Sequence, residues 1–393
     1  MKKRKLDGKR GLGRIAIVLL AGSMAATGGA ADSTQKSKTL ELEAVGSFSV
    51  GGRSVCAPGT FDPTVPGAGS RNAGQCFEID QLYAQYQIPE DARKLPIVMI
   101  HGGAGTGRVW ETTPDGREGF QTMFVRRGFP VYVIDAPRGG RARAPTFNGP
   151  LGVLSDTENF IPSGTTSSTG SHQAFISWRL GASYPNFFPG SQFPQSGLKQ
   201  FLQSIIPGIG TNLPVNVAST VALLDRIGPA ILFTHSLSGV WGWDVVFQHK
   251  NVKGVVTFEG GYVFPPDAMP PSLLNCAGTP IVQGSATTAE NFAKLTKIPI
   301  LVMYGDNQPT CPEPNRIRDG HQLNPIKGQT FVNTLKSHGG KAEFIWLPKI
   351  GIFGNTHFIF MDKNNVQIAD LVSRFFKKYG LDKDSKNHHR PHH

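Results

Sequence analysis

Short apolar runs alternate with amphipathic stretches along most of the chain. Runs of four to six mainly apolar residues, several rich in Val and Ile, predict buried strands at 96–100, 130–134, 230–233, 254–258, 299–304 and 342–347. Weaker alternation predicts two further β segments at 46–50 and 81–88. Helical spacing of apolar residues predicts helices at 117–127, 215–227, 240–250, 327–338 and 365–379. Strands that alternate with amphipathic helices indicate an α/β fold, with a mostly parallel sheet covered on both faces.

One long segment interrupts this alternation. Residues 142–213, here called the insertion segment, follow the fourth predicted strand and are rich in Gly, Pro, Ser and Phe. A segment of this length inside a compact domain is usually functional or unstructured. Its many aromatic residues favour an ordered cap over a site, with a solvated loop as the alternative. The main domain is expected at 32–380, followed by a disordered His-rich tail at 381–393.

The N-terminus has the pattern of a signal peptide. A basic stretch leads into the apolar run 15–21 and then into small residues, which predicts a signal peptide at 1–31 and export to the periplasm or medium of a bacterium. The apolar run is short for a membrane span, so no stable span is expected after cleavage. Residues 1–30 hold seven of the 40 basic and one of the 28 acidic side chains, so half of the net charge of +12 lies there. The remainder is mildly basic without a Lys/Arg block, which argues against nucleic acid as a partner.

Export changes the interpretation of the four cysteines. An even number of cysteines in an oxidising compartment favours disulfides. Because each closes a modest local loop, the pairs Cys56–Cys76 and Cys276–Cys311 are predicted, with free buried thiols as the alternative. No Cys-x-x-Cys or close Cys/His pair is present, so neither a metal site nor a cofactor is predicted.

The most informative motif is Thr-His-Ser-Leu-Ser-Gly at 234–239, directly after an apolar run. A sharp strand-to-helix turn exposes one hydroxyl when the residues two before and two after it are small. Ser236 is therefore the candidate nucleophile. A serine nucleophile needs a base, and His357 lies between the last predicted strand and the last predicted helix. Other histidines lie at helix ends or in loops and suit structural roles.

The residue that would orient this histidine is ambiguous. Glu259 and Asp306 both end predicted strands, and either can instead cap a turn or helix. The oxyanion donors are clearer, because glycines that follow the strand at 96–100 let the backbone approach a substrate. The N–H groups of Gly103 and Leu237 are the predicted donors. The glycine spacing there is not that of a dinucleotide-binding loop.

Several further motifs occur in register and in order between about residues 80 and 378. They are His101-Gly102 with Gly107-x-x-Trp110-Glu111, Trp178-Arg179 through Tyr184-Pro185 to Phe188-Pro189-Gly190, His235-Ser236-x-Ser238-Gly239, Glu259-x-Gly261, and Gly354-Asn355-x-His357. With them the chain resembles a small family of bacterial exported esterases of the α/β-hydrolase superfamily that use a Ser-Glu-His triad.

The resemblance implies an α/β-hydrolase fold and selects Glu259 as the triad acid, although the commonest α/β-hydrolase arrangement would use Asp306. It also implies a homodimer. The chain departs from this family at two places. The family's type member has adjacent cysteines where this chain has Gly103-Ala104. The residue after the nucleophile resembles Gln in the family, whereas this chain has Leu237.

The sequence thus predicts a secreted serine hydrolase that cleaves small-molecule carboxylic esters through an acyl-enzyme on Ser236. Lactone or thioester cleavage is the nearer alternative. A catalytically silent α/β-hydrolase fold used for binding is the more distant one.

Overall fold

The computed structural model describes residues 39–56, 58–64, 73–74, 76–142, 166–167, 170–205, 208–209 and 213–385. The chain divides into residues 1–39 and 40–393, and the fold described below is that of the second unit. The predicted signal peptide lies outside the described residues. So does the end of the predicted tail, residues 386–393. Leu381 is buried in the core, so the folded unit extends past the predicted boundary at residue 380.

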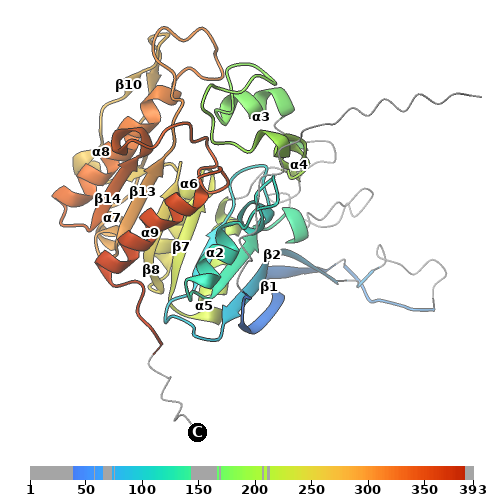
Figure 1. Cartoon of the computed structure of the whole chain (residues 1–393). Helices are drawn as coiled ribbons and strands as arrows, with labels where there is room; N and C mark the ends of the chain where they lie inside the picture. Colours follow the sequence, from blue (N-terminus) through green and yellow to red (C-terminus); the bar gives the residue numbers. More distant parts are fainter. Residues whose placement is uncertain are drawn as a thin grey trace, which may run out of the picture. The chain divides into compact units, whose positions relative to one another are not determined.

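An eight-stranded sheet in the order β1-β2-β4-β3-β7-β8-β13-β14 forms the centre of the fold (Figure 1). Its strands are β1 (Leu42–Cys56), β2 (Cys76–Pro89), β3 (Ile97–Ile100), β4 (Val131–Asp135), β7 (Ala230–His235), β8 (Val252–Phe258), β13 (Ile300–Tyr304) and β14 (Ala342–Trp346). The six strands from β4 to β14 run parallel, whereas β1 and β2 are antiparallel. This mostly parallel sheet confirms the predicted fold class.

Helices cover both faces of the sheet, and each face has its own hydrophobic core. The helices on one face are α1 (Arg108–Glu111), α2 (Phe120–Arg126) and α9 (Asn365–Tyr379); those on the other are α5 (Leu213–Ile227), α6 (Ser238–Gln248), α7 (Ala289–Leu295) and α8 (Asn324–Ser337). Alternate residues of each strand point to opposite faces. In β3, Ile97 and Met99 join the first core while Val98 and Ile100 join the second. This explains why the parallel strands read as continuous apolar runs.

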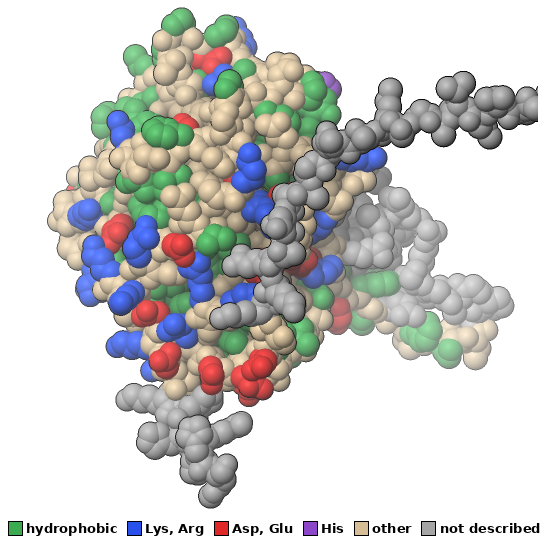
Figure 2. Space-filling view, in the orientation of Figure 1, with side chains coloured by type: hydrophobic (Ala, Val, Ile, Leu, Met, Phe, Trp, Pro, Cys, Tyr) green, Lys and Arg blue, Asp and Glu red, His purple; other side chains and the backbone are tan. Residues whose placement is uncertain are grey.

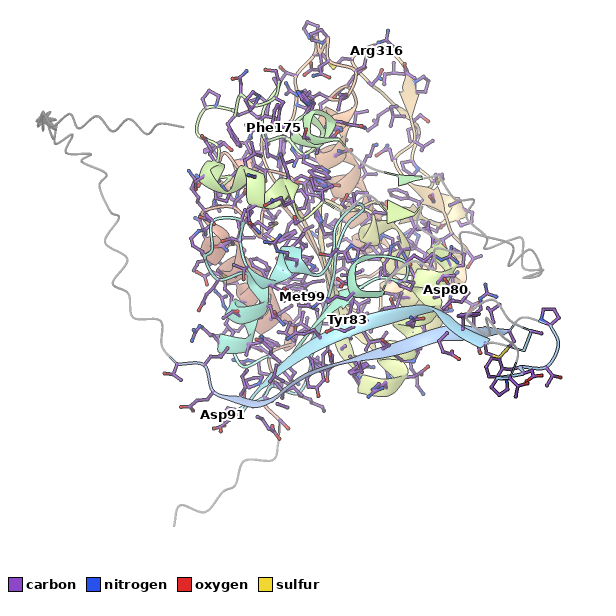
Figure 3. All side chains as sticks on the ribbon, turned by 90° about the vertical axis from the view of Figure 1, so that its right-hand side faces the viewer. Asp80, Tyr83, Asp91, Met99, Phe175 and Arg316 are labelled. Atoms are coloured by element: carbon purple, nitrogen blue, oxygen red, sulfur yellow. A yellow bond between two sulfur atoms is a disulfide. The ribbon has the colours of Figure 1, made fainter. Side chains whose placement is uncertain are left out.

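The first two strands are longer than predicted. They form one antiparallel hairpin in which Leu42 faces Pro89 and Cys56 faces Cys76, with a disulfide between those two cysteines. Figure 3 shows the hairpin extending away from the sheet past Asp80. The sequence pattern weakens toward the tip because that part of the hairpin has no core beneath it. The second predicted disulfide, Cys276–Cys311, is also present, which confirms both pairings.

The insertion segment is described only in part. The short helix η1 (Gly140–Ala142) leads into it. Its described elements are the strand pair β5 (Thr166–Ser167) and β6 (Gly208–Ile209), α3 (Ser171–Ser177), η2 (Gln195–Gly197) and α4 (Leu198–Leu202). Figure 1 shows α3 and α4 together at one end of the sheet. The remaining short elements are β9 (Val263–Phe264), η3 (Pro266–Ala268), β10 (Leu273–Leu274), β11 (Pro280–Ile281), β12 (Ser285–Ala286), η4 (His321–Leu323) and η5 (Leu347–Ile350).

On the face shown in Figure 2, basic and acidic side chains are interspersed rather than gathered into one stripe. None of the helices in the described ranges has the length and apolar character needed to span a bilayer.

Candidate active site

Ser236 lies at a sharp turn between β7 and α6, as the motif predicted. Its backbone adopts a left-handed conformation with φ 51°, which a non-glycine residue rarely does outside constrained sites. Ser238, where glycine is usual, is buried and ties the turn together. Its hydroxyl accepts a hydrogen bond from the His235 N–H at 2.8 Å and lies 3.1 Å from the Ile100 carbonyl oxygen. The small residues around Ser236 thus permit and hold a strained turn.

The predicted oxyanion loop follows β3 and lies against this turn. A Cβ atom on Gly102 would come within 2.8 Å of His235 Nδ1 and 3.1 Å of Ser236 Cβ, so only glycine fits there. A Cβ atom on Gly103 would lie 3.3 Å from Leu237 Cδ2. The two predicted donor residues, Gly103 and Leu237, are therefore neighbours beside Ser236.

Hydrogen bonds to the end of β4 hold the predicted oxyanion loop in place. His101 Nε2 accepts from the Ala136 N–H at 3.1 Å, which leaves Nδ1 to donate to the Gly102 carbonyl at 2.7 Å. Asp135 accepts from the Gly107 N–H and from Arg141 Nε at 2.6 Å. These contacts restrain the loop that follows β3.

Glu259 and His357 meet at the carboxyl end of the sheet. Glu259 directly follows β8, has φ 57°, and its side chain is 1% exposed. Its Oε2 lies 3.4 Å from His357 Nδ1, while Oε1 accepts from the Gly305 N–H at 2.6 Å. Oε1 also pairs with Arg179 Nη2 at 2.5 Å. A carboxylate on Nδ1 fixes the tautomer in which Nε2 is free to act as a base.

Asp306, the alternative acid, takes a different position. Its Oδ2 accepts from the Gly354 N–H at 2.7 Å, three residues before His357 in the chain. Within the described residues its carboxylate makes no hydrogen bond to the imidazole. The geometry thus pairs Glu259 with the ring and Asp306 with the loop that carries it.

His357 lies beside the turn that holds Ser236. Its carbonyl oxygen is 3.0 Å from His235 Nε2, and the centroids of the two rings are 4.6 Å apart. The backbone N–H of His357 donates to the Trp178 carbonyl at 3.0 Å. The Ser236 hydroxyl forms no hydrogen bond to any residue that the structure describes. Such contacts are often long without substrate and tighten in the complex.

A buried carboxylate, that of Asp362, holds the loop that carries His357 by hydrogen bonds. Asp362 accepts from the Thr356 N–H at 2.8 Å and from Asn355 Nδ2 at 3.0 Å. Burial raises the pKa of Asp362 to about 7, although these hydrogen bonds act in the opposite direction.

The surroundings set the charges needed for acid–base chemistry. Burial alone would raise the pKa of Glu259, but Arg179, His357 and the Gly305 N–H outweigh it, so its pKa is lowered and the carboxylate stays ionised. Burial lowers the pKa of His357 despite its bond to Glu259, so the ring is neutral at pH 7 and able to accept a proton. Burial, followed by repulsion from the Arg179 guanidinium, lowers the pKa of nearby His321 to about 4.

Sequence reasoning assigned no role to Arg179, although the Trp178-Arg179 pair was part of the resemblance. No spacing rule links a residue of the insertion segment to a strand end 80 residues later. The available signal was chemical, because a buried glutamate requires a cation or several donors.

Two comparisons with known proteins bear on this geometry. The chain is 27% identical over 333 residues to "Probable secreted lipase phiG" of a fungus (Fungal sp. strain ATCC 74256), covering 78% of this chain and 88% of that protein. The atomic-resolution structure of a bacterial esterase is 28% identical, with a TM-score of 0.68 over 87% of this chain and 98% of that chain. The chain is an α/β-hydrolase. No protein-family model matches its sequence.

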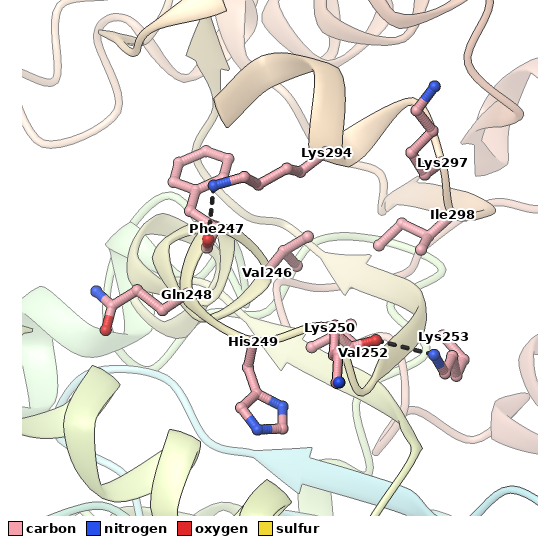
Figure 4. Close-up of a pocket in the computed structure, with 10 residues that line it drawn as sticks. All are labelled: Val246, Phe247, Gln248, His249, Lys250, Val252, Lys253, Lys294, Lys297 and Ile298. Atoms are coloured by element: carbon pink, nitrogen blue, oxygen red, sulfur yellow. Dashed lines mark hydrogen bonds between the residues drawn. The ribbon is translucent and has the colours of Figure 1, made fainter. Parts of the chain in front are cut away.

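The α/β-hydrolase also has a cavity of about 520 Å³ away from the candidate site (Figure 4). It is lined by Val246, Phe247, Gln248, His249, Lys250, Val252, Lys253, Lys294, Lys297 and Ile298. Val252 begins β8, whereas Glu259 directly follows its end. The cavity therefore lies at the amino ends of the parallel strands, and the site at their carboxyl ends, where open α/β sheets bind ligands. Among the described residues there is no cluster of three His, Cys, Asp or Glu side chains able to hold a metal ion.

Proposed function

We propose that this α/β-hydrolase is a secreted serine hydrolase that cleaves carboxylic esters through an acyl-enzyme on Ser236. The observation that carries the proposal is the placement of His357, which contacts buried Glu259 through Nδ1 and packs beside the turn that carries Ser236. The lipase and esterase names of the two relatives support the carboxylic ester hydrolase class. The motifs shared with the Ser-Glu-His esterases support membership of that smaller family.

In the first half of the reaction, His357 Nε2 takes the proton of the Ser236 hydroxyl while Oγ attacks the ester carbonyl carbon. Glu259 stabilises the resulting imidazolium, and the N–H groups of Gly103 and Leu237 hold the negative oxygen of the tetrahedral intermediate. The imidazolium then gives its proton to the departing alcohol, and the C–O ester bond breaks.

In the second half, His357 deprotonates a water molecule that attacks the acyl-enzyme carbonyl. A second tetrahedral intermediate forms at the same oxyanion donors. Its collapse breaks the bond to Ser236 Oγ, which recovers its proton from His357, and releases the carboxylic acid. The same steps open lactones and cleave thioesters, so those substrates are tested alongside simple esters.

The proposal is tested with a fluorophosphonate probe and a panel of p-nitrophenyl esters, lactones and thioesters. Labelling at Ser236, and a fall in kcat of about a millionfold in Ser236→Ala, are expected because removing the nucleophile disables the whole relay. Ser219→Ala is the matched control, since that buried hydroxyl donates to the Asp80 carbonyl outside the site. A folded wild-type protein that takes up no probe and cleaves no substrate would favour the silent binding protein.

Secretion, the cap and the homodimer are further parts of the proposal. The N-terminal pattern, the two disulfides and the secreted fungal relative support export. Sequencing the N-terminus of the exported protein checks cleavage near residue 31, and sedimentation checks the dimer. The described helices α3 and α4 support a cap formed by residues 142–213.

A further inference from the structure

Arg179 is an almost fully buried cation in the insertion segment, two residues after α3. Its side chain is 1% exposed and its backbone has φ 59°. The guanidinium makes two directed contacts: Nη2 pairs with Glu259 Oε1 at 2.5 Å, and Nε donates to the Asp306 carbonyl at 2.8 Å. A buried guanidinium held by two elements in a constrained backbone conformation has little freedom to turn away.

Because of these contacts, the two oxygens of the Glu259 carboxylate have different partners. Oε1 receives both Arg179 and the Gly305 N–H, which leaves Oε2 to face His357 Nδ1. The carboxylate is held on one side by two donors, one from the loop after α3 and one from the residue after β13. A group whose partners fix its orientation in this way presents one lone pair reproducibly to its neighbour.

We propose that Arg179 is a positioning residue of the proton relay: it locks the Glu259 carboxylate as an anion with Oε2 turned toward His357. The inference rests on the proposed serine hydrolase mechanism and extends it to a residue of the insertion segment. Among the described residues Arg179 makes no hydrogen bond to Ser236 or His357, so its direct contact with the triad is to Glu259.

The charge of Arg179 also reaches His357. Arg179 contributes to lowering the pKa of His357, after burial, and is the main group that lowers the pKa of Glu259 against burial. Loss of the guanidinium charge therefore raises both pKa values, and the imidazole protonates at higher pH. The other titratable groups around this pair are His235, Tyr262, Tyr304, Asp306, His321 and Asp362.

A purely structural role would give a different result. Arg138 offers a matched case: it pairs with Asp80 through Nε at 2.6 Å and Nη2 at 3.1 Å, both side chains are buried, and its backbone has φ 67°. Within the part of the chain that the structure describes, that pair makes no hydrogen bond to Ser236, Glu259 or His357. Arg138→Met therefore removes a comparable buried ion pair without changing the charge beside Glu259.

The experiment measures kcat and KM for a p-nitrophenyl ester across pH in the wild type, Arg179→Met, Arg179→Lys and Arg138→Met. In Arg179→Met we expect kcat to fall by roughly 10- to 100-fold with little change in KM, as for other groups that orient a catalytic side chain. We also expect the acid limb of the pH profile, where kcat/KM falls as the pH decreases, to move to higher pH. Arg179→Lys keeps the charge but loses the paired geometry, so kcat falls while the limb stays nearer its wild-type position. Arg138→Met lowers the melting temperature and leaves the limb unmoved.

The outcomes separate the two proposals. A wild type that takes up no fluorophosphonate at Ser236 removes the mechanism and, with it, the role of Arg179. Labelling in the wild type together with an unmoved acid limb in folded Arg179→Met removes the role of Arg179 alone. If Arg179→Met does not fold, the kinetics of Arg179→Lys test the proposed role of Arg179. In that variant, a wild-type kcat or a limb displaced to higher pH contradicts the proposal.

Discussion

The carboxyl ends of β8 and β13 carry the same kind of residue and use it differently. The two strands are parallel neighbours, and each is followed by an acid, Glu259 one residue and Asp306 two residues after the strand end. Glu259 turns through a left-handed backbone into the buried side of the His357 ring. Asp306 instead receives the Gly354 N–H on the loop leading to that ring. Both acids serve one histidine, one by touching it and the other by holding its loop.

Replacing each acid in turn by its amide is the strongest test of the different roles of Glu259 and Asp306. Glu259→Gln is expected to lower kcat by roughly 10⁴-fold, the loss seen when a triad acid becomes an amide. Oε1 would still accept from Arg179 and Gly305, so the amide nitrogen would face His357 Nδ1 as a donor. The ring would then hold its proton on Nε2, in the wrong tautomer to accept one from Ser236. Steady-state kinetics at pH 7 measure the loss.

Asp306→Asn is the matched control for that variant. Its side-chain oxygen still accepts from the Gly354 N–H, and only the charge of the acceptor is lost, which is worth about 1 kcal/mol and less than about tenfold in rate. The reverse ranking of the two variants would assign the acid to Asp306 and leave Glu259 as a structural residue.

The pH dependence of kcat/KM sharpens the comparison further. Burial lowers the pKa of His357 below its ordinary value of about 6.5 even though Glu259 favours the charged ring. In the proposed mechanism the neutral ring is the base, so we expect activity to persist below pH 6.5 and to be lost as the pH falls through the His357 pKa. A pH series of ester hydrolysis with stable protein at each point checks this.

One neighbouring group could mimic that limb. Asp362 supports the His357 loop and has a pKa raised by burial to about 7, so about half of it is protonated at neutral pH. Asp362→Asn distinguishes the two: a limb set by His357 stays below pH 6.5 in this variant. A limb near pH 7 that disappears in Asp362→Asn would instead assign the transition to the support of the loop.

The parts of the fold that the sequence predicted well are those with strong local patterns. Strands such as β7 and β8 are continuous apolar runs because helices cover both of their faces, and their observed bounds extend the predicted ones by only two residues. The hairpin of β1 and β2 was underestimated because its outer half depends on pairing between strands 20 or more residues apart. Pairing across such distances leaves little trace in a local window.

The candidate site divides in the same way. The sharp turn at Ser236 was predictable because such a turn imposes small neighbours within two residues. Glu259 and Asp306 could not be ranked by pattern, since both end strands and the choice depends on the direction in which each side chain leaves the sheet. The contacts of Arg179 could not be predicted from local patterns, because those with Glu259 and Asp306 span 80 and 127 residues of the chain.

The smallest effect on activity is expected from the disulfide that restrains the loop after β13. Cys276–Cys311 closes a separation of 35 residues, and the Cys276 N–H also donates to Asp319 at 2.8 Å. Replacing both cysteines by serine should lower the free energy of unfolding by about 2–4 kcal/mol, mainly because the unfolded chain gains freedom. Glu259 and His357 are held by other contacts, so kcat/KM at 25 °C should be little changed. Denaturant unfolding and ester kinetics on the same preparation measure both quantities. A large loss of kcat/KM in the folded variant would mean that the loop after β13 contributes more to the relay than its contact with Gly354.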